Sequence, residues 1–147
     1  MTSAMKVTIL VDNERVSSGL QVEHGLSMWI ETPWGSVLFD TGKGGALGSN
    51  AAALGIDLLQ ADAVVLSHGH YDHTGGLPEM LGKGLAAPIY AHPDALEAKY
   101  SRDSDGRERF AGMPLLAAGG EDWEEVKARF VAILRPTGIT GEIFVTG

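Results

Sequence analysis

Short apolar runs alternate in this chain with stretches rich in alanine and glycine, and this alternation limits the folds open to it. Six runs have the length and the apolar, often β-branched, composition of strands: residues 7–11, 26–31, 36–39, 63–66, 89–91 and 143–145. Pro33 and Gly35 mark a turn between the second and third runs, which predicts a hairpin. Strands that alternate with helices are typical of an α/β domain of packed layers.

The segments between these runs are predicted as helices or loops. Helices are expected at residues 46–54, ended by Gly55; at residues 75–81, capped by Thr74; at residues 93–99; and at residues 122–130. Residues 101–109 are polar and charged and predict a surface loop. A chain of 147 residues fits one domain, so residues 1–147 are expected to form a single unit.

Charge and cysteine content exclude several kinds of partner and site. The net charge of −8 disfavours a nucleic-acid partner, because phosphate binding needs clustered Lys and Arg. The chain has no cysteine, so a metal site must use His, Asp or Glu, and a reducing compartment is favoured. No apolar run reaches the roughly 20 residues of a membrane helix or the 7–15 or so of a signal peptide. We therefore expect a cytoplasmic protein without a membrane partner.

Four potential metal ligands lie within six residues, directly after the apolar run 63–66: His68, His70, Asp72 and His73. Alternate side chains of an extended segment point to the same side, so His68 and His70 can converge on one ion. Asp72 and His73 follow where the chain turns toward a helix, and they can face a neighbouring position. Zinc is the usual ion for such donors, while iron and manganese are alternatives. A bound ion of this kind supplies hydroxide at neutral pH.

A second candidate feature is the glycine-rich loop at residues 42–45. It lacks the Gly-Lys-Ser/Thr ending of a phosphate-binding P-loop, so it is interpreted as a turn.

These residues resemble the metallo-β-lactamase-fold superfamily. The run LSHGHYDHTGGL at residues 66–77 is similar to its metal-binding motif, and VLFDTGKG at residues 37–44 is similar to the strand and loop before it. Three shorter runs, EHGLS (23–27), AHPDA (91–95) and TGITGEI (137–143), resemble a branch of metal-dependent hydrolases that includes dihydropterin ribofuranosylaminobenzene-phosphate synthases.

The resemblance implies a fold and a role for each matched residue. The fold would be an αββα sandwich, with a mixed sheet and flanking helices. His68 and His70 would hold the first of two metal ions. Asp72 and His73 would hold the second, with Asp72 also a catalytic residue that orients the attacking water. Asp40 would hold a ligand histidine in place, although an Asp at a strand end also forms turns.

The resemblance also implies that part of the site is missing. The second half of the superfamily's domain normally supplies another His, a bridging Asp and a final His, and this chain has no histidine after His92. The chain therefore corresponds to the N-terminal half, and its sheet should expose an apolar face. It would be a fragment of a longer protein, a chain that pairs with itself or another chain, or a remnant that binds one metal weakly. His24 and His92 receive no ligand role.

Three functions follow as hypotheses. The first is a hydrolase that uses a metal-activated water on a phosphate- or ester-containing small molecule. The second is a pterin-linked transferase or synthase of the same superfamily. The third is a catalytically silent metal-binding fragment, since two ligands for each ion give weak binding. Nothing in the sequence indicates a lactam pocket.

Overall fold

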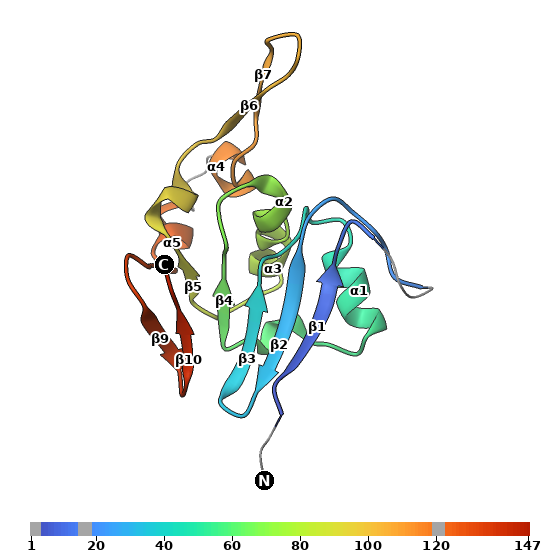
Figure 1. The fold of residues 1–147 in the computed structure, drawn as a ribbon, viewed down its shortest axis with the longest axis vertical. Helices are drawn as coiled ribbons and strands as arrows, with labels where there is room; N and C mark the ends of the chain where they lie inside the picture. The colour runs from blue at the N-terminus through green and yellow to red at the C-terminus, as the bar shows by residue number, and fades with distance from the viewer. Residues whose placement is uncertain (1–3, 15–18, 119–122) are drawn as a thin grey trace.

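The computed structural model describes residues 4–14, 19–118 and 123–147, and its centre is a six-stranded sheet (Figure 1). In spatial order the strands are β1 (Lys6–Val11), β2 (Ser27–Thr32), β3 (Gly35–Phe39), β4 (Ala63–Val65), β5 (Ile89–Ala91) and β8 (Phe130–Ala132). The pairs β1–β2 and β2–β3 are antiparallel, and the pairs from β3 to β8 are parallel. The expected mixed sheet is confirmed.

Helices cover one face of this sheet. They are α1 (Leu47–Ala53), α2 (Tyr71–Thr74), α3 (Leu77–Gly82), α4 (Pro114–Ala118) and α5 (Trp123–Lys127), with 3-10 turns η1 (Leu58–Gln60) and η2 (Pro93–Leu96). Leu47 of α1 and Leu77 and Met80 of α3 pack in one buried cluster with Leu38 and Val64 of the sheet. This larger core fixes α2 and α3 beyond the end of β4.

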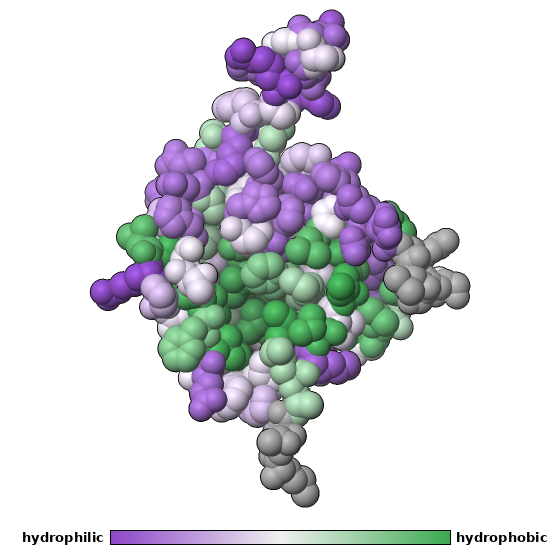
Figure 2. Space-filling view, viewed as in Figure 1, coloured by the Kyte–Doolittle hydropathy of each residue, from purple (hydrophilic) through white to green (hydrophobic). Residues whose placement is uncertain are grey.

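The opposite face of the sheet is apolar and only partly covered. A hairpin of β9 (Thr137–Thr140) and β10 (Ile143–Val145) packs Ile139, Ile143 and Val145 on Val37, Ala63 and Val65. Val7 and Ile9 of β1 belong to this face because they pair with Ile30 and Met28, yet they are 47% and 51% exposed. Figure 2 shows apolar side chains gathered over the middle of this side of the molecule. The exposed apolar face expected from the sequence is therefore present.

Several predicted elements differ from the structure. Residues 101–109 are not a loop: β6 (Tyr100–Arg102) and β7 (Glu108–Phe110) form an exposed hairpin that protrudes from the body (Figure 1). Its charged side chains pair across the hairpin, Arg102 with Glu108 and Arg109 with Asp103, so polar composition alone misled the prediction.

Three predicted helices have other bounds in the structure. Residues 93–99 give only the 3-10 turn η2, because Glu97 is already extended. The helix expected at residues 75–81 begins only at Leu77, as α3, and Thr74 ends the preceding helix α2, where its hydroxyl donates to the His70 carbonyl, instead of capping α3. The helix expected at 122–130 ends at Lys127, and Phe130 begins β8, because its pairing with β5 takes precedence; Asp122 lies outside the described residues. Strand β9 and helix α4 were not predicted.

Across residues 4–14, 19–118 and 123–147, no helix has the length and apolar character needed to cross a membrane.

Candidate metal centre

The candidate site lies where two neighbouring parallel strands end. β3 ends at Phe39 and is followed by Asp40, while β4 ends at Val65 and is followed by the loop that carries Ser67, His68 and His70. The carboxyl ends of parallel strands meet at one edge of a sheet, so Asp40 and Ser67 become neighbours. His70 is the extended residue before α2, and that helix carries Asp72 and His73 in its single turn.

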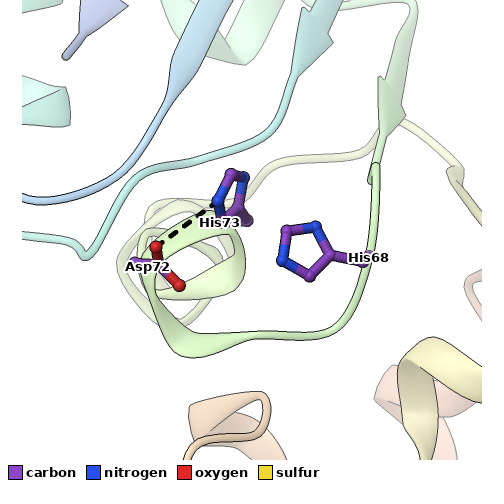
Figure 3. Close-up of side chains that lie close together, drawn as sticks. All are labelled: His68, Asp72 and His73. Carbon is purple, nitrogen blue, oxygen red and sulfur yellow. Dashed lines mark ion pairs between the residues drawn. The ribbon is translucent and has the colours of Figure 1, made fainter.

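The structure brings three of the four predicted ligands into one group and places the fourth, His70, beside His68. One possible ligand atom from each of His68, Asp72 and His73 lies within 4.8 Å of the others (Figure 3). His70 joins through His68: its Nδ1 lies 3.1 Å from His68 Nε2. Asp72 Oδ2 lies 3.4 Å from His73 Nε2. The tightest group is thus His68 with Asp72 and His73, and His70 adjoins it at His68.

Asp40 lies directly beneath this group and is fully buried. Its Oδ1 accepts a hydrogen bond from the Ser67 amide at 2.8 Å, and its Oδ2 accepts from the Ser67 hydroxyl at 2.6 Å and His73 Nδ1 at 2.7 Å. A carboxylate can only accept, so His73 carries its proton on Nδ1 and keeps a lone pair on Nε2. Asp40 therefore leaves the lone pair of His73 Nε2 facing the cluster.

The backbone at Asp40 is unusual. Its φ of 54° makes it the single non-glycine residue with positive φ in the described ranges. Residues held in this region cluster at functional sites, where the surroundings enforce the conformation. Asp40 does more than form a turn, because three hydrogen bonds converge on its side chain.

Ser67 in turn fixes which nitrogen of His68 carries the proton. Its one hydroxyl proton goes to Asp40 Oδ2, so Ser67 Oγ must accept from His68 Nδ1, 2.9 Å away. His68 Nε2 is then free of a proton and faces the cluster. Burial, and next the nearby His73 and His70, lower the pKa of His68 below 6.5, which favours the neutral imidazole that a metal needs.

The donor set fits a divalent transition metal. Two nitrogen ligands of a tetrahedral zinc ion at about 2.1 Å lie roughly 3.4 Å apart. The distance of 3.1 Å between His68 Nε2 and His70 Nδ1 is close to that spacing, as is the 3.4 Å from Asp72 Oδ2 to His73 Nε2. Imidazole with carboxylate suits zinc, iron and manganese.

The glycine-rich loop holds α2 in place. Thr41, directly before the loop, contacts α2: its amide and its hydroxyl both donate to the His73 carbonyl, at 2.7 and 3.0 Å. A Cβ on Gly75 would lie 2.1 Å from the Lys43 carbonyl oxygen, so only glycine permits this approach. The loop thereby fixes the distance between Asp40 and His73.

Sequence reasoning missed Glu23, which fills the centre of that loop. Its two carboxylate oxygens accept four backbone amides, those of Lys43, Gly44, Gly45 and Ala46, at 2.9–3.2 Å. The loop is thus an anion-binding turn whose anion comes from the chain itself. No signal in the sequence marks Glu23 as this partner, because the two segments are some 20 residues apart.

The two histidines left without a role occupy different places. His24 Nε2 lies 3.1 Å from Asp72 Oδ2, so His24 borders the cluster. His92 precedes η2, where its Nδ1 accepts the Asp94 amide at 3.2 Å, a local structural contact.

Two hollows lie beside the candidate site. One of about 400 Å³ opens beside Asp72 and His73 and is lined further by Asp12, Asn13, Glu14 and His24. The other, about 330 Å³, lies between the apolar sheet face and the β9–β10 hairpin; Ser67 and His92 reach its wall, while the cluster's Asp72 and His73 do not. The first hollow is the one that gives access to the candidate ligands.

Known proteins are similar to this chain in sequence and in fold. Residues 20–144 match the profile of the Metallo-beta-lactamase superfamily. A 7,8-dihydropterin-6-methyl-4-(beta-D-ribofuranosyl)-aminobenzene-5'-phosphate synthase of Methanocaldococcus jannaschii is 30% identical over 146 residues, which cover 95% of this chain and 49% of the synthase. A metal-dependent hydrolase of Staphylococcus aureus is 34% identical over 89 residues, which cover 60% of this chain and 37% of the hydrolase.

Among solved structures, MEM-A1, a subclass B3 metallo-beta-lactamase from a soil metagenome library, superimposes with a TM-score of 0.55. The match has 20% sequence identity and covers 85% of this chain and 46% of that one, so it shows the fold alone. The chain spans about half the length of the curated synthase it matches.

Proposed function

Because the chain belongs to the metallo-beta-lactamase superfamily, we propose that it carries the metal site of a hydrolase for a phosphate- or ester-containing small molecule. One observation supports this most strongly: the buried Asp40 carboxylate fixes His73 directly and His68 through Ser67. Both imidazoles then turn an unprotonated Nε2 toward Asp72. Hydrogen bonds from groups outside the ligand set orient metal-ligating histidines in this way.

His68 and His70 would hold one zinc ion, and Asp72 and His73 a second, with iron or manganese as alternatives. When bound, such an ion supplies Lewis-acid polarisation and a water molecule that loses its proton near neutral pH. The chain's own residues do the positioning. Asp72 Oδ2, 3.4 Å from His73 Nε2, would accept a hydrogen bond from a water beside the cluster and so orient it, and Asp40 keeps the His73 proton on Nδ1. Substrate would enter through the hollow beside Asp72.

The test is turnover of bis(p-nitrophenyl) phosphate and p-nitrophenyl acetate by the zinc-loaded chain. Asp72→Ala should lower kcat/KM at least about 100-fold, the usual contribution of a positioned acid–base group. Asp94→Ala is the matched control, because its carboxylate is exposed and lies beside His92, which is not a predicted ligand; it should leave turnover unchanged. Equal turnover by wild type and Asp72→Ala would overturn the proposal.

The synthase relative supports a second candidate, a pterin-linked transferase, because its similarity extends over 95% of this chain. Fold and motif do not fix the reaction. Consumption of a 7,8-dihydropterin without hydrolysis of either ester would favour this candidate over the hydrolase.

For the exposed apolar face we propose a second copy of the chain as partner. An apolar face of this kind rarely stays in water, and a symmetric dimer buries the same patch on both subunits. Two copies also equal about the length of the synthase relative. Light scattering after size exclusion should give a dimer that Ile9→Asp dissociates and Leu54→Asp, on the helical side, does not. A monomer at every concentration would contradict this proposal.

A further inference from the structure

Residues 24–26 pack onto the turn that carries Asp72. The Leu26 amide donates to the Asp72 carbonyl at 3.4 Å. Gly25 makes the approach possible, because its φ is 138° and a Cβ there would lie 2.2 Å from the same carbonyl oxygen. His24 is therefore held at the Asp72 side chain by backbone packing, and not by chance orientation of a surface residue.

Asn13 determines which nitrogen of His24 carries the proton. The Gly25 amide donates to Asn13 Oδ1 at 2.9 Å, which turns the Asn13 amide nitrogen toward His24. Asn13 Nδ2 then donates to His24 Nδ1 at 3.2 Å, so Nδ1 has no proton in the neutral ring. The proton lies on Nε2, and Nε2 faces Asp72 Oδ2 at 3.1 Å.

We infer that His24, oriented by Asn13, is a positioning residue that donates its Nε2 proton to Asp72 Oδ2 and holds the carboxylate toward His73. The inference rests on the proposed metal site. It extends to Asp72 the arrangement that Asp40 gives His73: a hydrogen-bond partner outside the ligand set fixes the ligand's direction. A protonated Nε2 has no lone pair, so His24 is not itself a ligand.

The exposure of the two side chains separates positioning from a structural role. The His24 side chain is 62% exposed, while that of Asp72 is 13% exposed. A hydrogen bond from so exposed a ring contributes little to folding, because water replaces it when it is lost. Removal of His24 should therefore change the carboxylate and its metal affinity while the thermal stability stays almost constant.

Three variants of the full chain test this inference: His24→Ala, His24→Gln and the control His92→Ala. Zinc affinity is measured by competition with a chromophoric chelator, and thermal unfolding is followed on the same samples. His24→Ala should weaken the weaker zinc site 10–100-fold, as loss of such a partner usually does. His24→Gln, whose amide can donate to Asp72, should stay within about threefold of wild type, and His92→Ala should equal wild type.

A second measurement needs no metal. Long-range proton–nitrogen NMR spectra of the metal-free protein should show His24 as the Nε2–H tautomer, and Asn13→Ala should reduce that population. An Nδ1–H tautomer in wild type, or zinc affinity in His24→Ala equal to wild type, would overturn the inference. Wild type that binds no zinc would instead contradict the proposed function, while the tautomer would still decide the role of His24.

Discussion

Asp40→Asn changes one atom of the side chain and should disable the site through hydrogen bonds alone. In the native protein two donors face Asp40 Oδ2, the Ser67 hydroxyl at 2.6 Å and His73 Nδ1 at 2.7 Å. Asparagine keeps Oδ1 for the Ser67 amide but places an NH₂ group, itself a donor, at the position of Oδ2. The Ser67 hydroxyl and His73 Nδ1, both donors, then face this NH₂ group, which is a donor as well.

The loss in unfolding free energy depends on how many of these hydrogen bonds can form again in the variant. Ser67 can rotate its hydroxyl to accept, and His73 can move its proton to Nε2, so full loss of both bonds is the upper limit. At about 1–3 kcal/mol for each unsatisfied buried donor, we expect a loss of about 2–4 kcal/mol in the free energy of unfolding. The tautomer change also places a proton on His73 Nε2, where the ligand lone pair was, and zinc affinity should fall 10–100-fold or more.

The assay is urea unfolding of chelator-stripped protein, followed by zinc competition titration of the same variant. Asp94→Asn is the control, since its side chain is 82% exposed and makes the same chemical change on the surface. An Asp40→Asn variant whose unfolding free energy stays within about 0.5 kcal/mol of wild type, and whose zinc affinity stays within about twofold, would refute the reasoning.

Three further predictions use other contacts. Glu23→Gln sets an NH₂ group against backbone amides of the loop at Lys43–Ala46 and should cost about 1–3 kcal/mol in urea unfolding; no change would contradict the anion-binding turn. Gly25→Ala combines a strained φ with a Cβ 2.2 Å from the Asp72 carbonyl oxygen, and should lower both stability, by about 2–5 kcal/mol, and zinc content; a normal zinc content would argue against this packing. Because the pKa of His68 is lowered on folding, the unfolded chain binds more protons just below pH 6.5, so the metal-free protein should lose stability as pH falls through that range. A urea midpoint that is higher at pH 5.5 than at pH 7 would contradict this pH dependence.

The strands of the main sheet could be predicted because their signal is local. The runs at 7–11, 36–39 and 63–66 are apolar and β-branched, and they lie within β1, β3 and β4 or overlap them closely. β8 was hidden because Phe130 sits at helical spacing from Trp123 and Val126, and only pairing with β5 makes it a strand. The hairpin β6–β7 was hidden because polar composition does not reveal the pairing of its two strands.

The candidate site also contains residues that local sequence predicts and residues that it does not. His68, His70, Asp72 and His73 are close in sequence, so their convergence follows from one loop and one helical turn. Asp40 could be proposed from its resemblance to a known motif, but its partnership with Ser67 depends on strand pairing between β3 and β4. The contacts of Glu23, His24 and Asn13 join residues 11 to 48 positions apart in the sequence, and no local pattern indicates such contacts.

The metal content of the chain tests the central claim most directly. Protein purified by size exclusion without chelator, then loaded with zinc and desalted, should contain about two ions per chain by elemental mass spectrometry, and a His68→Ala, His73→Ala double variant should contain almost none. Wild type that retains less than a tenth of an ion per chain, or a double variant with the same content as wild type, would contradict the assignment of these residues as metal ligands.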